Sequence, residues 1–108
     1  MKLPAKIYAI RHDVTGKIYI GRSANVKTRM QHHLCLLRSG RHPVEDMQAD
    51  FDKYGERFTL SILDEVRVWG DRVKEKEWQR RLNTQDRRCG YNYKDPNIPD
   101  KAGIHEPI

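Results

Sequence analysis

The chain has 108 residues, a third of them charged, and its 21 Lys and Arg against 15 Asp and Glu give a formal net charge of +6. This length fits one domain with a single modest core. A pI near 9.5 makes polyanions the first class of partner to consider, and no apolar run is long enough to predict a membrane-spanning segment.

The two cysteines, Cys35 and Cys89, are far apart in the sequence, and neither belongs to a C-x-x-C pair. Their spacing does not fit a zinc knuckle and predicts two free thiols in a reducing compartment. The N-terminal stretch MKLPAKIYAI is interrupted by proline and lysine and has neither the form of a secretory signal nor that of a transit peptide. We therefore expect a cytoplasmic protein without a membrane anchor.

The first predicted structure is a β-hairpin formed by residues 6–11 and 17–21. Both runs are short and rich in Ile and Tyr, and the segment HDVTG between them has the Asp and Gly of a turn. With the loop centred just after Asp13, Tyr8 is expected directly opposite Tyr19. Side chains alternate along strands, so both hydroxyls should leave the same face of the sheet.

Two helices should follow, over residues 25–39 and 43–54. The apolar residues of the first recur at helical spacing, and Gly40 follows them. These residues are Val26, Met30, Leu34 and Leu37. The second helix begins with Pro43, which is favoured in a first turn, and is followed by Gly55.

The run RFTLSIL then alternates apolar and polar residues and predicts a third, half-buried strand over 58–63. Its apolar positions are Phe58, Leu60 and Ile62. A third helix should run from Asp71, a suitable N-cap, to Leu82. The sequence thus predicts an α+β fold in which a small three-stranded antiparallel β-sheet is flanked by three helices. The folded domain should span residues 1–94, and residues 95–108 should form a loosely ordered tail.

The residue types near the hairpin suit chemistry on a phosphate. Arg29 and His33 are four residues apart and so lie one above the other on a flank of the first helix. A guanidinium neutralises charge on phosphoryl oxygens, a base activates water, and a carboxylate holds a divalent cation. Glu75 can supply the carboxylate, because it shares a helix face with Trp78 and Leu82. We expect these groups to line one cleft with the two tyrosines, and Glu77 to point elsewhere.

The sequence resembles the GIY-YIG nuclease family. KIYAI at residues 6–10 matches the first half of the family signature, and YIG at residues 19–21 matches the second. The family arginine and histidine fall on Arg29 and His33, EKEWQRRLN places the family glutamate at Glu75, and the late GYN ends at Asn92. The match covers residues 6–92, and DFDKYGERFTLSIL is most similar to the catalytic domains of phage-type homing endonucleases. Lys6 stands where the signature has its first glycine.

The resemblance implies a DNA endonuclease that uses Mg²⁺ or Mn²⁺ in a one-metal mechanism. Glu75 would be the only protein ligand of the ion. Tyr8 would be the general base, although an ordinary tyrosine titrates at about pH 10, and Arg29 would stabilise the pentavalent transition state. The other site residues would orient water and phosphate or support the site; they are Tyr19, His33 and Asn92. Relatives often carry a separate targeting segment, so a targeting protein, or a fused domain in its place, is a further expected partner.

Several basic residues are expected to contact the DNA backbone, where contacts position the substrate without reading its sequence. They are Arg22, Lys27, Arg38, Arg80, Arg81, Arg87 and Arg88. Each of them alone is more typical of solvated surface. A metal site of His32, His33 and Cys35 is excluded, because neighbours at such spacing on one helix cannot all face one ion.

Two rival functions stay open at this point: a non-catalytic nucleic-acid-binding module, and a module that a partner recruits. The sequence also leaves open DNA against RNA, nicking against double-strand cleavage, the biological role and the oligomeric state.

Overall fold

The structure is a computed structural model that describes residues 5–66 and 73–93. The described residues form, in chain order, β1 (Ala5–His12), β2 (Ile18–Ser23), α1 (Val26–Arg38), α2 (Glu45–Tyr54), β3 (Phe58–Val66) and α3 (Val73–Leu82). The strands make one antiparallel sheet in the order β2-β1-β3. This confirms the predicted α+β fold. The expected helix start at Asp71 and the expected tail over 95–108 lie outside the described residues.

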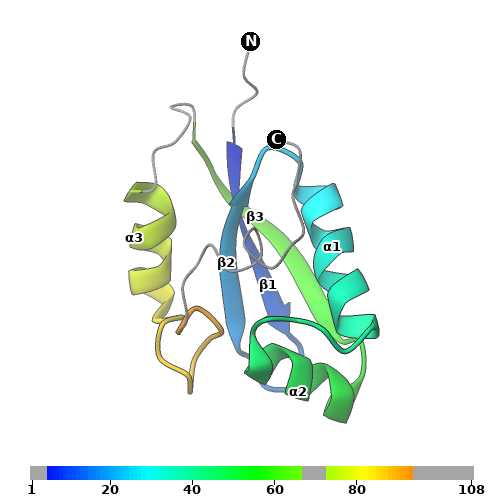
Figure 1. Ribbon diagram of the computed structural model, residues 1–108. Helices are drawn as coiled ribbons and strands as arrows, with labels where there is room; N and C mark the ends of the chain where they lie inside the picture. The colour runs from blue at the N-terminus through cyan, green and yellow to red at the C-terminus, as the bar shows by residue number, and fades with distance from the viewer. Residues whose placement is uncertain (1–4, 67–72, 94–108) are drawn as a thin grey trace.

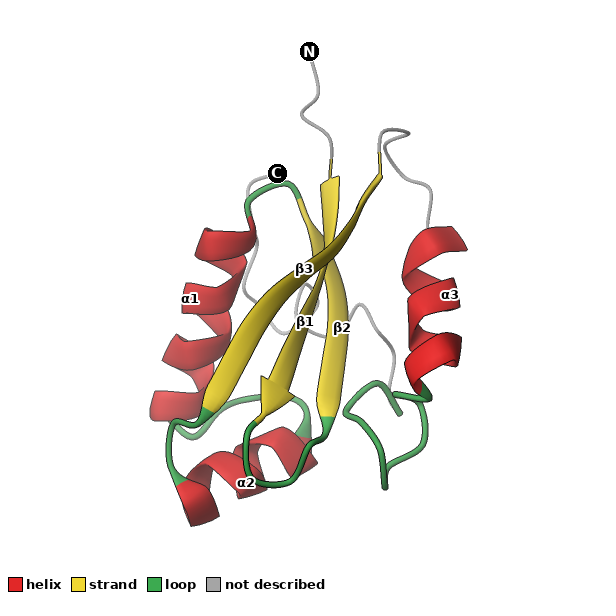
Figure 2. Cartoon of the chain, turned by 180° about the vertical axis from the view of Figure 1, so that it is seen from behind, coloured by secondary structure: helices red, strands yellow, loops and turns green. Residues whose placement is uncertain are grey.

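The sheet is the middle layer of the domain. Figures 1 and 2 show α1 on one side of it, α3 on the other, and α2 across the end where the hairpin turns. Side chains alternate along each strand, so the sheet has two apolar faces. Tyr8 and Tyr19 belong to the core on the side of α1 and α2, whereas Ile7 and Ile20 belong to the core that α3 covers through Trp78.

The hairpin register differs from the prediction. Tyr8 pairs with Gly21, and Tyr19 pairs with Ile10, so the expectation that the tyrosines are directly opposite is wrong. The strand continues to His12, because the imidazole Nδ1 accepts hydrogen bonds from two amides of the turn, and the loop closes later than expected. A slip of two residues keeps each side chain on its face, and the two tyrosines remain neighbours with ring centroids 6.3 Å apart.

The ends of the first two helices follow from local chemistry. The Asn25 side chain accepts a hydrogen bond from the Thr28 amide and caps α1. Beyond the end of α1, the Arg41 amide bonds the Leu36 carbonyl. The second helix begins at Glu45 and not at Pro43, so the predicted spans are correct to within about two residues at each end.

The third strand contains an irregularity that the apolar alternation did not predict. The register with β1 shifts between Ile7, which faces Asp64, and Tyr8, which faces Ile62. The extra residue of this bulge, Leu63, packs against the core on the α3 side. Ile62 is 52% exposed, so the prediction that it continues the half-buried face is wrong.

Cys35 and Cys89 are exposed free thiols, as expected. In the part of the chain that the structure describes, no helix has the length and apolar character needed to cross a bilayer.

Candidate active site

Tyr8, Tyr19 and His33 form a compact group on the face of the sheet that α1 covers. The Tyr8 hydroxyl lies 3.2 Å from His33 Nε2, and the Tyr19 and His33 rings meet edge to face with centroids 5.0 Å apart. All three side chains are buried. The hairpin and the first helix thus bring together three predicted site residues.

Arg29 lies one turn before His33 on α1, as the spacing predicted, and is buried despite its charge. The two side chains interact electrostatically. Burial, the neighbouring His42 and the Arg29 charge together hold the pKa of His33 well below its ordinary value. His33 is therefore neutral at neutral pH, and Arg29 carries the positive charge of this group.

His42 belongs to the same group, although no sequence pattern predicted it. Its Nε2 lies 2.9 Å from His33 Nδ1, and its Nδ1 accepts a hydrogen bond of 3.1 Å from the Val44 amide. Burial lowers the pKa of His42 to about 4. The only local signal was a histidine directly before Pro43, at the start of a helix. Its contact with His33 depends on how the chain turns between α1 and α2.

Asn92 lies at the free edge of β2 and takes the place of a neighbouring strand. Its Oδ1 accepts a 2.7 Å hydrogen bond from the Ile20 amide, and its Nδ2 donates a 3.0 Å bond to the Ile20 carbonyl. Gly90 makes a parallel bridge with Ile18, and a Cβ at position 90 would overlap the backbone of Thr84. The GYN run therefore holds the edge of the strand that carries Tyr19.

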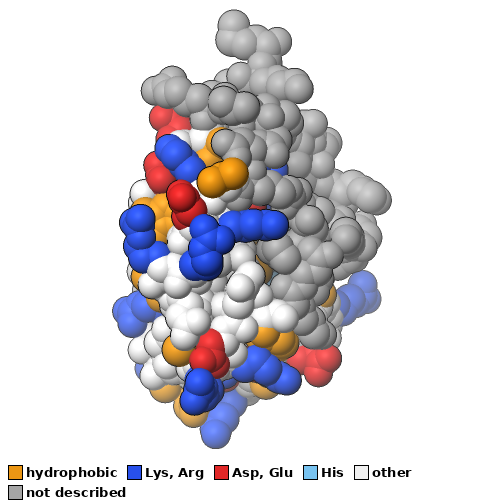
Figure 3. All heavy atoms as spheres, turned by 90° about the vertical axis from the view of Figure 1, so that its left-hand side faces the viewer, with side chains coloured by type: hydrophobic (Ala, Val, Ile, Leu, Met, Phe, Trp, Pro, Cys, Tyr) orange, Lys and Arg blue, Asp and Glu red, His pale blue; other side chains and the backbone are white. Residues whose placement is uncertain are grey.

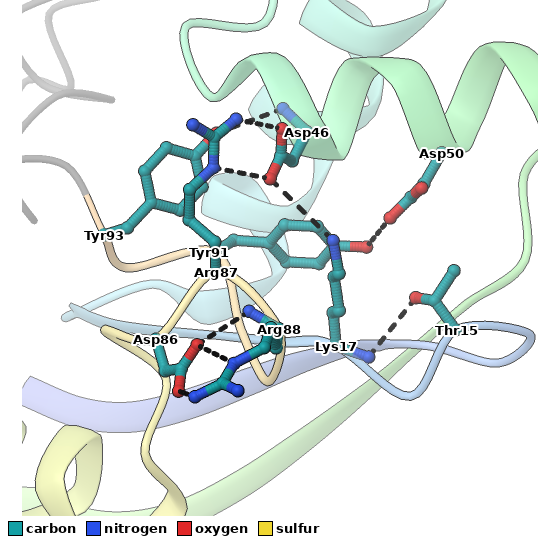
Figure 4. A network of polar contacts seen from close by, with 9 residues as sticks. All are labelled: Thr15, Lys17, Asp46, Asp50, Asp86, Arg87, Arg88, Tyr91 and Tyr93. Atoms are coloured by element: carbon teal, nitrogen blue, oxygen red, sulfur yellow. Dashed lines mark hydrogen bonds and ion pairs between the residues drawn. The ribbon is translucent and has the colours of Figure 1, made fainter.

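A polar network fastens this segment to α2 (Figure 4). The Tyr91 hydroxyl donates a 2.6 Å hydrogen bond to Asp50, and burial together with this carboxylate raises the pKa of Tyr91. The Arg87 guanidinium bonds both oxygens of Asp46 and lowers the pKa of that carboxyl. The Asp46 amide donates to the Tyr93 hydroxyl. These contacts fix residues 86–93, which include Asn92.

Glu75 is 4% exposed, in the first turn of α3, and Glu77 is exposed, as predicted. The Trp78 and Leu82 side chains of this helix pack on the sheet face opposite to the tyrosines. The first turns of α1 and α3 both lie at the end of the sheet where β2 ends (Figure 1). Because α3 packs against β2, the Glu75 carboxylate would reach the tyrosine side of the sheet around the edge of that strand. That Glu75 lines one cleft with the two tyrosines stays a prediction.

The donor set fits a hard cation that substrate and water help to coordinate. Mg²⁺ usually binds one or two carboxylates and keeps several waters and substrate oxygens, and Glu75 is a buried carboxylate of α3. Within residues 5–66 and 73–93, no cluster of three or more His, Cys, Asp and Glu could hold an ion. An all-protein cage is therefore not formed by the described residues.

Ion pairs engage several of the basic residues predicted to contact DNA. Arg38 pairs with Glu56, Arg87 with Asp46, and Arg88 with Asp86. Such exposed pairs contribute little to stability, but each places a negative charge beside the arginine. Lys27, Arg80 and Arg81 are exposed, and the Arg81 guanidinium lies over the Trp78 ring. Figure 3, which views the side of α3, shows Lys and Arg side chains spread over this surface.

Comparison with known proteins places this arrangement in a family. The family described as the GIY-YIG catalytic domain matches residues 4–92. The chain is 32% identical over 101 residues to Intron-associated endonuclease 1 of Enterobacteria phage T4, and this match covers 92% of the chain and 40% of that relative. The chain therefore spans less than half the length of the curated relative that it matches.

Two solved structures share the fold. The catalytic domain of intron endonuclease I-TevI, in a glutamate-to-alanine mutant, superimposes with a TM-score of 0.77 at 29% identity, over 86% of this chain and 96% of that one. A structure of the catalytic domain of homing endonuclease I-TevI gives a TM-score of 0.72 at 29% identity, over 81% and 95% of the two chains. On the family match and the shared fold, this chain belongs to the GIY-YIG catalytic-domain family.

Proposed function

We propose that this domain is a metal-dependent endonuclease that hydrolyses phosphodiester bonds of DNA. The observation that carries the proposal is the buried contact between Tyr8 and His33, beside the charge of Arg29, on a GIY-YIG fold. An arginine and two histidines are buried together beside two phenols, and such a group of polar side chains is rare in a core but common at functional sites. The names of the similar proteins, which are endonucleases, support the same reaction class.

In this proposal Tyr8 accepts the proton of the attacking water. Its oxygen already contacts an imidazole nitrogen, and a donor at that position favours the negatively charged form of the oxygen. Arg29 stabilises the negative charge that develops on the phosphoryl oxygens. A buried, preorganised charge is effective here, because little water screens it. Tyr19 and His33 orient the water and the phosphate.

Glu75 would hold the divalent cation, Mg²⁺ or Mn²⁺. When bound, such an ion polarises a phosphoryl oxygen and compensates charge on the leaving group. Asn92 supports the site by fixing the edge of β2 at Ile20. Because the proposed site has one ion with one carboxylate ligand, Arg29 would supply the positive charge that a second ion supplies in two-metal enzymes.

The basic surface positions the DNA backbone. We propose that Lys27, Arg80 and Arg81, which are exposed, contribute most. The arginines in ion pairs contribute less, because binding to a phosphate competes with the carboxylate already bound. These are Arg38, Arg87 and Arg88.

A plasmid assay tests the reaction class. Supercoiled DNA should be converted to nicked or linear forms with Mg²⁺ or Mn²⁺ and should stay intact with a chelator. A gel shift without cleavage in any metal would indicate a nucleic-acid-binding module instead. Neither cleavage nor a shift would indicate a module that depends on a partner. An RNA duplex of the same sequence, assayed in parallel, separates DNA from RNA as the substrate.

A further inference from the structure

The hydrogen bonds around His33 form a chain with one allowed direction. The chain runs from the Val44 amide through the rings of His42 and His33 to the Tyr8 oxygen, with donor–acceptor distances of 3.1, 2.9 and 3.2 Å. A neutral imidazole donates from one nitrogen and accepts at the other. Once one hydrogen in such a chain is placed, all the others are determined.

The backbone places that first hydrogen. The Val44 amide always carries its proton, so Nδ1 of His42 must accept, and the proton of His42 must lie on Nε2. Nε2 of His42 then donates to Nδ1 of His33. His33 is left with its proton on Nε2, the nitrogen that faces the Tyr8 oxygen.

We infer that His42 is a positioning residue that keeps His33 a hydrogen-bond donor to Tyr8. Resting on the function proposed above, this gives the tyrosine oxygen a donor in both of its protonation states and favours the phenolate that a general base needs. His42 itself touches no reacting atom; it acts through His33.

The opposite direction is inconsistent with the contacts. If Tyr8 donated to Nε2 of His33, then Nδ1 of His33 would donate to His42, and the His42 proton would have to lie on Nδ1. Two hydrogens would then face each other between His42 and the Val44 amide. A doubly protonated His33 meets the same conflict, because it also donates from Nδ1.

Elsewhere in the protein, His12 offers a matched control. Its Nδ1 accepts from the amide two residues later, Val14, as that of His42 accepts from Val44. Its ring is as buried as those of the pair, but it packs against Phe58 and Tyr54. An effect of losing a buried, amide-bonded imidazole would appear at both positions, whereas an effect on the chain to Tyr8 would appear only at His42.

Nitrogen NMR of the wild-type protein measures the direction without any activity assay. In a ¹⁵N-labelled sample at neutral pH, with signals assigned through single-histidine variants, His33 should show a protonated Nε2 and an unprotonated Nδ1. His42 should show the same form. A His33 with its proton on Nδ1 overturns the proposal, whether or not the protein cleaves DNA.

Cleavage by three variants then tests the role. His42→Leu, which cannot donate, should lower the rate by about 10- to 100-fold, the loss typical of removing a group that orients a site residue. His42→Gln can present an amide N–H near the place of Nε2 and should recover most of the rate and the Nε2–H form of His33. His12→Leu should cleave as wild type at temperatures where it is folded. Wild-type cleavage by folded His42→Leu, or an equal loss in His12→Leu, overturns the proposal.

Discussion

Tyr8 and Gly21 are cross-strand partners in the hairpin, and the tyrosine ring occupies the space that a side chain at position 21 would fill. A Cβ on Gly21 would overlap the ring carbon Cζ and the hydroxyl of Tyr8. The glycine in the YIG half of the signature is therefore explained by the tyrosine in the other half. The ring is fully buried, so it has no open space into which to move.

Gly21→Ala should destabilise the domain by about 1–3 kcal/mol, the usual cost of overpacking a core, although alanine has the better backbone entropy in a strand. Equilibrium denaturation checks this. In a double-mutant cycle with Tyr8→Ala, the cost of the alanine at position 21 should largely disappear, because the colliding ring is gone. Additive costs would contradict the contact.

Glu75→Gln should reduce DNA cleavage below detection in the plasmid assay with Mg²⁺. The amide keeps the size of this buried side chain but is a much poorer ligand for a hard cation. The matched control is Glu77→Gln on the exposed face of the same helix, which should cleave as wild type. Wild-type cleavage by folded Glu75→Gln would mean that another carboxylate holds the ion.

Arg29→Ala should lower the cleavage rate by roughly 10²- to 10³-fold or more, by analogy with the loss of one oxyanion-hole donor. Single-turnover kinetics with saturating enzyme measure this, and DNA binding should persist. Lys27→Ala, two residues away and exposed, is the control and should affect binding alone. If Arg29→Ala changes the affinity and leaves the saturated rate intact, the arginine binds DNA and does not stabilise the transition state.

DNA affinity should fall steeply with salt, with a log–log slope of roughly 0.9 per phosphate contact. Changing Arg80 and Arg81 together to Ala should reduce the slope and the affinity, and should leave turnover by saturated enzyme almost unchanged. Changing Arg88, which is bound to Asp86, to Ala should have a smaller effect on the salt slope and on the affinity. A salt-independent affinity would argue for recruitment by a partner.

The stability of the domain should fall as the pH drops from about 6.5 to about 4. Burial lowers the pKa of His42 in the folded state from 6.5 to about 4, so between these values the unfolded chain binds more protons and acid favours unfolding. The loss from this residue is on the order of 3 kcal/mol, and His33 acts in the same direction. Denaturation at stepwise pH checks this, and His42→Gln should flatten the dependence. A stability that rises toward pH 4 would show that the histidines are not buried as neutral groups.

The sequence alone determined the features that depend on local periodicity. Alternation in the strands placed both tyrosines on one face, and this survived a register error of two residues because the side-chain period of a strand is two. The helical period placed Arg29 and His33 on one flank of α1, and Glu75 on the same side of α3 as Trp78 and Leu82, which pack on the sheet. Such patterns repeat every few residues, so they can be recognised in the sequence without knowing how distant segments pack.

Only the tertiary structure decided which distant groups meet. The pairing of His42 with His33 depends on the path of the chain between α1 and α2, and Asn92 reaches the backbone of Ile20 across 72 positions of sequence. The pairing of Arg87 with Asp46 likewise joins a late loop to α2. No periodic pattern carries these contacts, because hydrogen bonds and ion pairs between elements depend on how whole helices pack against the sheet. The direction of the hydrogen-bond chain to Tyr8 follows from that packing, since one backbone amide must meet one imidazole nitrogen.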